Sequence, residues 1–241
     1  MPEPKKDVIV YDLEIRNNPE TLVPGDPQAG WKLYDQMGIS VLVSYHFREK
    51  NYRIWTEETL PQFVKAIERC DLRVSFNGYR FDDLVLIGLG HLLDLEPHYD
   101  IQHELRIAAG IGPEDHSTAG GMKLTQILYS TLGRDKSKYS GAKALEQWGG
   151  IRKNSWAMGE GECPVSRENQ AIESIKYAAK LIEGCMDDVK DTADLFMLIA
   201  NDQPLVSPIH GKLKLPHPST HFRPTTRVYA PQPSEAFPEA L

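Results

Sequence analysis

The chain has 241 residues, of which 41% are hydrophobic and 25% are charged, and its formal net charge is −7 at pH 7. This composition is typical of one globular domain, or one domain with appendages, that can bury a sizeable core. No apolar run approaches the roughly 18 to 20 residues of a membrane span, and the N-terminus lacks the layout of a signal peptide. We therefore expect a soluble cytoplasmic protein with no membrane partner.

The cysteines and the acidic balance exclude further classes of protein. Cys70, Cys163 and Cys185 are odd in number and far apart, which argues against a disulfide framework and against structural zinc. A net negative charge does not favour nucleic-acid binding over the whole surface, so a polyanion would need a local basic patch or a bound metal. One stretch is locally basic, with these cations: Arg134, Lys136, Lys138, Lys143, Arg152 and Lys153.

The first third of the chain predicts a small sheet followed by a helix. Residues 8–15, VIVYDLEI, form an apolar strand, and the Pro- and Gly-rich residues 16–31 form a long loop. Residues 39–47 and 51–56 are β-branched and aromatic and predict a hairpin that extends the first strand. Residues 56–70 begin with a Thr cap and then space their apolar residues as a helix does.

Strands and helices alternate in the next part of the chain. Residues 72–77 predict a strand, 80–93 a helix, and 98–110 a short strand that runs into a helix. Residues 123–133 and 141–150 each predict a helix that ends at glycine.

The C-terminal part divides into a helical segment and a Pro-rich segment. Residues 166–200 are helical almost throughout, and Gly184 predicts an interruption that makes two helices of them. Residues 201–241 hold eight of the 17 prolines and little periodic hydrophobicity. They predict an extended tail that wraps the domain or binds a partner, with simple disorder as the alternative.

Acidic residues occur in pairs in the first predicted strand and at the start of two predicted helical segments. Asp12 and Glu14 alternate with Leu13 in the first strand, so both carboxylates project from one face, roughly 6.5 to 7 Å apart along the chain. Two acids in a poorly solvated site resist ionisation unless a cation or hydrogen bonds compensate. The pairs at 82–83 and 187–188 begin helical segments, where each alone would be an ordinary N-terminal acid.

Taken together, the three acidic stretches resemble the exonuclease family with an Asp-Glu-Asp-Asp core, called DEDD or DnaQ-like, of the ribonuclease H-like superfamily. The family's Asp-x-Glu strand matches Asp12 and Glu14, its Asn-x-x-x-aromatic-Asp motif matches residues 77–82, and its third motif, Asp-Val with a Thr shortly after, matches residues 188–192. Two further segments, YDIQHEL and LGRDKSKYSGAKALEQW, resemble the branch found as helicase-associated or stand-alone exonuclease-like domains. The resemblance covers roughly residues 7 to 200.

The resemblance implies an α/β fold of ribonuclease H-like type, with a mixed five-stranded sheet flanked by helices. It implies a 3′–5′ exonuclease domain over residues 1–200, with residues 201–241 as a Pro-rich tail. The expected substrate is the 3′ end of DNA or RNA, and the expected protein partner is a helicase or another replication or repair protein. An endonuclease or resolvase of the same fold is the rival enzyme, and the second motif favours the exonuclease branch.

The resemblance also implies which cations would compensate the charges of these acids. Family members hold two divalent ions, Mg²⁺ or Mn²⁺, and carboxylate oxygens suit these hard cations. Two such ions can activate a water on one side of a phosphodiester and stabilise the leaving oxygen on the other. By this resemblance the metal ligands are Asp12, which bridges the two ions, with Glu14, Asp82 and Asp188. Asp83 and Asp187 are the alternatives in a register shifted by one residue.

The sequence departs from the family at the residue that orients the attacking water. The family has Tyr four residues, or His five residues, before the last Asp, and this chain has Gly184 and Glu183 there. Glu183 is one candidate catalytic base, and Tyr177 or Lys180 could replace it. The bound metal could also activate water without a protein base. The remaining alternative is a weakened or inactive relative that binds nucleic acid or a protein.

Residues around the acids are candidates for substrate contacts. By the resemblance, apolar and aromatic side chains beside the first two motifs could pack or stack on a base, which is worth roughly 1 to 3 kcal/mol; these are Leu13, Ile15, Tyr79 and Phe81. Core packing is the alternative for each of them. Asn77 could hydrogen-bond the sugar or backbone, or only hold the turn. The candidates for backbone phosphates are Lys136, Lys138 and Lys143.

Overall fold

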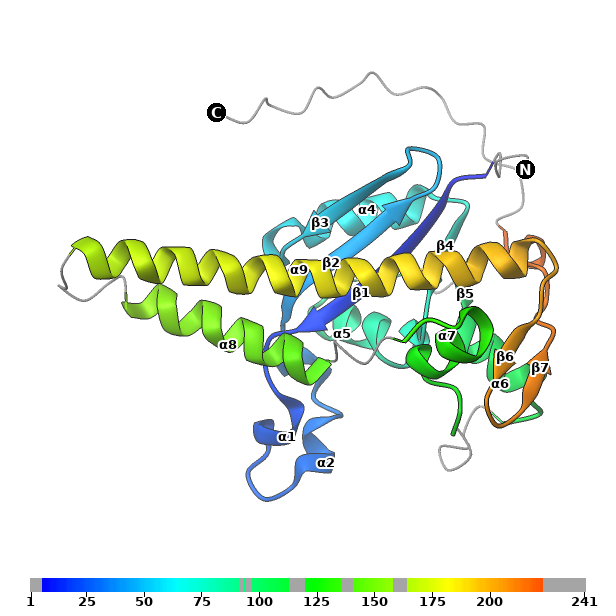
Figure 1. Ribbon diagram of the computed structural model, residues 1–241, viewed down its shortest axis with the longest axis horizontal. Coiled ribbons are helices and arrows are strands. Elements are labelled where there is room, and N and C mark those ends of the chain that lie inside the picture. Colours follow the sequence, from blue (N-terminus) through cyan, green and yellow to red (C-terminus); the bar gives the residue numbers. More distant parts are fainter. Residues whose placement is uncertain are drawn as a thin grey trace.

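A computed structural model of the protein describes residues 6–91, 93, 97–112, 120–135, 141–157 and 164–222. Its centre is a five-stranded mixed sheet with the strand order β3-β2-β1-β4-β5 (Figure 1). The strands are β1 (Val8–Ile15), β2 (Ile39–His46), β3 (Asn51–Trp55), β4 (Leu72–Ser75) and β5 (His98–Asp100). β1 pairs antiparallel with β2 and parallel with β4, so the central strand is the one that carries the first acidic motif.

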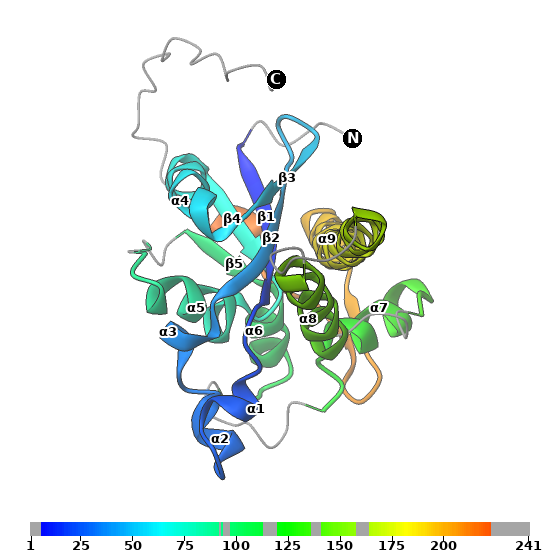
Figure 2. The ribbon, with the colours of Figure 1, turned by 90° about the vertical axis from the view of Figure 1, so that its left-hand side faces the viewer.

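Helices cover both faces of the sheet (Figure 2). α4 (Leu60–Arg69) and α5 (Asp82–Gly88) pack on one face, together with the odd-numbered residues of β1 such as Ile9 and Tyr11. The opposite face holds Val8 and Val10 of β1 and the long helix α9 (Pro164–Ala200). Because side chains alternate along a strand, this two-sided burial explains why β1 reads as a nearly continuous apolar run.

The fold class expected from the sequence is confirmed: the protein is α/β, with a mixed five-stranded sheet flanked by helices. The remaining helices of eight or more residues are α6 (Ile101–Ala108), α7 (Leu124–Leu132) and α8 (Gly141–Ala157). Within the described part of the chain, no helix combines the length and the apolarity that crossing a membrane requires.

Short helical turns replace part of the predicted long loop. Three single-turn helices lie between β1 and β2: α1 (Pro19–Leu22), α2 (Pro27–Gly30) and α3 (Tyr34–Met37). Proline occupies the first position of α1 and of α2, and the caps Asn18 and Asp26 accept backbone N–H hydrogen bonds. Residues that signal a loop therefore also start these turns. Short 3₁₀ helices occur at Glu57–Thr59, Gly78–Arg80 and Pro218–Thr220.

Glycine does not interrupt the two long helices. α9 is one helix of 37 residues, so the prediction of two helices separated at Gly184 was wrong. α8 likewise continues past Gly149 and Gly150, where we predicted its end. A glycine inside a helix costs about 1 kcal/mol relative to alanine, which tertiary packing readily offsets. Gly184 is buried, and α9 packs along both α8 and the sheet (Figure 1).

The first part of the Pro-rich segment is folded, which corrects the expectation of an extended tail for these residues. β6 (Leu205–Ser207) and β7 (Gly211–Leu213) form an antiparallel hairpin beside α7 (Figure 1). Leu205 and Leu213 join the core, and the Val206 N–H donates to Thr131 Oγ1 of α7 at 2.9 Å. Apolar residues at alternate positions provide this burial. Residues 223–241 lie outside the described part of the chain.

Candidate metal centre

Two of the predicted ligands come from β1 and one from α9. Asp12 and Glu14 project from the sheet face that α9 covers, as the alternation from Val8 and Val10 requires. Each of Asp12, Glu14 and Asp188 offers a carboxylate oxygen, and these oxygens lie within 4.8 Å of one another. The fold thus brings together acids that are more than 170 positions apart in the sequence.

The structure separates Asp188 from its neighbour Asp187. Asp188 is half-buried and belongs to the group of three acids, whereas Asp187 is exposed on α9. Successive residues of a helix point about 100° apart, so only one of the pair can face the sheet. The geometry therefore favours the register in which Asp188 is the ligand.

Asp82 approaches β1 from the opposite layer, beyond the end of the ladder between β1 and β4. The parallel ladder between β1 and β4 ends at Val10, whereas β1 continues to Ile15. Beyond that point the Leu13 N–H donates to Asp82 Oδ1 at 3.0 Å. The carboxylate thus takes the place of a ladder partner for the strand that carries Asp12 and Glu14.

The electrostatic setting of Asp82 is unfavourable to its charge. Burial raises the pKa of this carboxyl well above its usual range, and the negative charges of Asp12 and Asp83 raise it further. Its side chain is almost inaccessible to solvent. A divalent cation beside Asp12 would reverse this effect, because an opposite charge nearby favours the ionised form.

Asp83 has a different role, although it is equally buried. Tyr11 Oη donates to Asp83 Oδ1 at 2.5 Å, and Arg73 Nη2 and His98 Nδ1 each lie 3.2 Å from Asp83 Oδ2. Burial alone would raise the pKa of Asp83, but the contacts with His98, Arg73 and Tyr11 hold it below its usual value. Asp83 already has the Arg73 guanidinium as a counter-charge, together with the Tyr11 and His98 contacts, so it does not need a metal.

Cys185 is a site residue that the sequence did not single out. Its thiol is buried and lies 3.4 Å from Asp12 O and 3.6 Å from Asp12 Oδ2, as a donor to both. Burial raises the thiol pKa strongly, and the charge of Asp12 adds to this, so the sulfur stays protonated. One signal was available, because Cys185 lies three residues before Asp188 and so shares its helix face.

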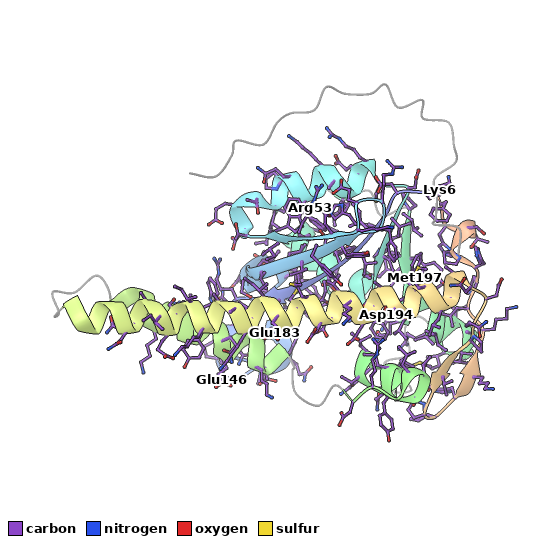
Figure 3. The ribbon with its side chains drawn as sticks, turned by 45° about the horizontal axis from the view of Figure 1, so that its top comes forward. Lys6, Arg53, Glu146, Glu183, Asp194 and Met197 are labelled. Atoms are coloured by element: carbon purple, nitrogen blue, oxygen red, sulfur yellow. The ribbon has the colours of Figure 1, made fainter. Side chains whose placement is uncertain are left out.

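The candidate bases are not brought to the acids. Glu183 is exposed and lies midway along α9 (Figure 3). Because α9 is continuous, five residues turn a side chain by roughly 140°, so Glu183 and Asp188 point to different sides. Lys180 is exposed, and Tyr177 lies against Gly150 of α8, about 16 Å along the helix axis from Asp188.

The apolar substrate candidates belong mainly to the core. Leu13 and Ile15 pack in the cluster beneath α4 and α5 and are 3% and 7% exposed, which leaves little surface for a base. Phe81 packs against the same cluster. The half-buried ring of Tyr79 lies between His98 and His103, with centroid distances of 4.3 and 5.4 Å.

Asn77 holds the turn of the second motif. It adopts a left-handed conformation with φ of 73°, which asparagine tolerates better than most residues. Its N–H and that of Tyr79 each donate to the buried Asp100 carboxylate at 2.9 Å. The Asn77 side chain remains a candidate for sugar contact.

Of the three lysines predicted to contact phosphate, Lys143 lies among the described residues. Lys143 is exposed in the first turn of α8, while Lys136 and Lys138 lie outside the described residues. Arg134, just after α7, pairs with Asp191 and Asp194 of α9 at 3.1 and 2.6 Å. Those pairs tie the end of α7 to α9.

The donor set fits a hard divalent cation. All the ligand atoms that meet here are carboxylate oxygens, which is the chemistry that Mg²⁺ and Mn²⁺ prefer. Asp12 and Asp188 are half-buried rather than sealed, while Glu14 is 7% exposed. The site therefore combines a nearly buried carboxylate, Glu14, with two carboxylates that still reach solvent.

Comparison with known proteins adds a distant structural likeness. No family model and no curated protein sequence matches the chain. One similar solved structure is a family B DNA polymerase from the hyperthermophilic archaeon Pyrobaculum calidifontis, at 14% identity and a TM-score of 0.48. The match covers 81% of this chain and 25% of the polymerase, so the chain spans about a quarter of that protein's length.

Proposed function

We propose that the protein is a metal-dependent 3′–5′ exonuclease that hydrolyses phosphodiester bonds of DNA or RNA by a two-metal mechanism. The observation that carries the proposal is the convergence of Asp12, Glu14 and Asp188. Asp82 lies outside that group of three and is bonded to the N–H of Leu13, the residue between Asp12 and Glu14. The order of the three sequence motifs supports the exonuclease reading. No observation supports a helicase as the partner.

The four carboxylates would hold two Mg²⁺ or Mn²⁺ ions. When bound, such ions activate a water on one side of the phosphodiester and stabilise the leaving oxygen on the other. The chain's own contribution is placement: β1 fixes Asp12 and Glu14, α9 fixes Asp188, and the Leu13 N–H orients Asp82. Glu183 is turned away from Asp188, so we do not assign it the role of base.

Lys143 would serve as a phosphate contact near the acids. It lies in the first turn of α8, one residue before the buried Ala144, and α8 packs against α9 and β1. A cation there can bind a backbone phosphate without reading the base, which suits an enzyme that shortens any sequence.

A matched pair of variants tests the proposal. Oligonucleotides of DNA and of RNA, single- and double-stranded and labelled at either end, are incubated with the protein and Mg²⁺ or Mn²⁺. We expect shortening from the 3′ end that EDTA stops. Asp188→Asn should abolish it, and Asp187→Asn, which removes the same charge one position away, should retain it.

Two outcomes would contradict the proposal. Substrates that stay intact with every metal would favour the second candidate, a binding module, for which the exposed Glu183 and the buried Gly184 in place of the usual Tyr or His are the motivating observation. Equal loss of activity in Asp187→Asn and Asp188→Asn would contradict the assignment of the ligand.

A further inference from the structure

A buried polar network lies beneath α5, on the sheet face opposite the three clustered acids. Its members come from β1, β4, α5 and β5, and none is more than 2% exposed: Tyr11, Arg73, Ser75, Asp83 and His98. Arg73 pairs with Ile9 of β1 and with His98 of β5 in the sheet registers, so these side chains share one face. The network is enclosed by the apolar cluster of that face.

Asp83 is the centre of this network. It accepts the Tyr11 hydroxyl at 2.5 Å and lies 3.2 Å from a nitrogen of Arg73 and from one of His98. The other ring nitrogen of His98 lies 2.7 Å from Ser75 Oγ. Burying charged groups costs free energy that an apolar cluster of equal volume would avoid, so stability alone does not explain the network.

Two members of the network are sequence neighbours of predicted metal ligands. Tyr11 precedes Asp12 in β1, and Asp83 follows Asp82 in α5. The Tyr11–Asp83 bond and the bond from the Leu13 N–H to Asp82 therefore join the same strand to the same helix, one on each side of Asp12. Together they fix the position of Asp82 relative to Asp12.

We propose that Tyr11 and Asp83 are positioning residues of the metal centre, which act by holding Asp82 in register with Asp12. This inference rests on the proposed function, because it assumes that these acids bind a metal. Partners that orient metal ligands from behind commonly contribute about 10- to 100-fold in metal affinity. Such a role explains why a buried aspartate that is already paired with Arg73 stands directly after a predicted ligand.

The same network does not form a nucleophilic catalytic triad. Ser75, His98 and Asp83 follow one another as a serine, histidine and aspartate do in hydrolases. Ser75 is fully buried, however, and its Oγ accepts the Gly78 N–H at 3.1 Å. A hydroxyl enclosed in this way has no access to a substrate.

The test compares two buried tyrosines of the same sheet. Tyr11→Phe removes only the hydroxyl that binds Asp83, and the ring contact with Phe63 is kept. Tyr99→Phe removes a similar hydroxyl bond, to Pro216 O at 2.7 Å, on β5, which is separated by β4 from the strand that carries Asp12 and Glu14. Mn²⁺ affinity is measured from the electron paramagnetic resonance signal of free Mn²⁺, and stability from urea unfolding.

We expect both variants to lose some stability but only Tyr11→Phe to weaken Mn²⁺ binding, by about tenfold or more. Equal Mn²⁺ affinity in Tyr11→Phe, Tyr99→Phe and the wild type would overturn the inference and leave the proposed function standing. A wild type that binds no Mn²⁺ would overturn both.

Asp83→Asn provides a second route if Tyr11→Phe does not fold. Asp187→Asn is its control, because it removes one negative charge beside Asp188 without touching the network. The inference requires weaker Mn²⁺ binding in Asp83→Asn than in Asp187→Asn, and equal affinities in the two variants would overturn it.

Discussion

At the scale of single residues, the fold shifts the pKa values of two adjacent aspartates in opposite directions. Asp83 is buried with Arg73 and His98 beside it and keeps a pKa below its usual value. Asp82 is buried facing the charges of Asp12 and Asp83, and its pKa is raised. The protein compensates the charge of Asp83 internally, and the proposed function assigns compensation of the Asp82 charge to a bound cation.

His46 is a third buried ionisable residue and lies on β2, opposite Ile9. It is 4% exposed in β2, and its Nε2 lies 3.0 Å from Ser44 Oγ, which also accepts the Trp55 indole N–H at 2.8 Å. Burial, followed by the charge of Arg53, lowers its pKa to about 4. Unfolded histidine has a pKa of about 6.5, so between these values the unfolded chain binds the proton more strongly.

His46 should therefore make the fold sensitive to mild acid. Above about pH 6.5 the histidine is neutral in both the folded and the unfolded state, so it does not reduce stability. As the pH falls from there towards about 4, the unfolded chain takes up a proton that the folded chain does not, and stability is lost. We expect the free energy of unfolding to fall by about 1 to 2 kcal/mol between pH 7.5 and pH 5 on account of this residue. Urea unfolding of the wild type and His46→Gln at both pH values measures the difference, and identical pH dependence would refute the assignment.

The sequence located the acids but could not assign roles within each pair. Asp12 and Glu14 follow from strand alternation, and their meeting with Asp188 was expected only from the resemblance to a nuclease family. The separate roles of Asp82 and Asp83 depend on Arg73 and on residues brought by β5, and no local pattern indicates such contacts. Cys185 was missed because a lone cysteine is usually structural.

At the scale of elements, α9 determines how the site is built. A single helix of 37 residues runs along α8 and then across the sheet, so Asp188 lies over β1 (Figure 1). We predicted a break at Gly184 from helix propensity, which is a weak preference that packing overrides. The unbroken helix turns Glu183, the candidate base, away from Asp188.

Two adjacent glycines test the packing of α8 on α9. An added Cβ at Gly149 would meet nothing within 4 Å, whereas one at Gly150 would lie 2.7 Å from the Tyr177 ring. We expect Gly149→Ala to stabilise the protein by about 0.5 to 1 kcal/mol, because alanine favours the helix. Gly150→Ala should destabilise it by about 1 to 3 kcal/mol through overpacking.

Urea unfolding of the two glycine variants measures both effects. A stabilising Gly150→Ala would mean that α8 and α9 do not pack as described. The proposed nuclease activity should be the same in Gly149→Ala and the wild type, since an added Cβ at that position meets no other atom within 4 Å.

At the scale of the whole molecule, two helical layers and a C-terminal hairpin enclose the sheet. The layered arrangement was expected from the resemblance to the nuclease family. The sequence itself predicted individual elements, because residues 8–15 form an apolar run and residues 56–70 and 123–133 space their apolar residues as helices do. It did not predict the hairpin of β6 and β7, whose strands have three residues each and whose prolines signal an irregular chain. Short strands depend on their neighbours, here on α7 and the core.

The central claim is that the fold holds its acids together, against their mutual repulsion, for a divalent cation. Because the folded-state pKa of Asp82 lies above the unfolded value, the metal-free protein loses stability as the pH rises through that pKa. A ligand that binds only the folded state raises stability, by about 2.7 kcal/mol at a concentration 100 times its dissociation constant.

Thermal unfolding at pH 8, with and without Mn²⁺, of the wild type and Asp82→Asn tests this claim most directly. We predict that Asp82→Asn melts at a higher temperature than the wild type when EDTA is present, because repulsion with Asp12 is relieved. Mn²⁺ should raise the melting temperature of the wild type clearly and that of the variant little. An equal Mn²⁺ shift in both proteins, or no shift in the wild type, would contradict the account.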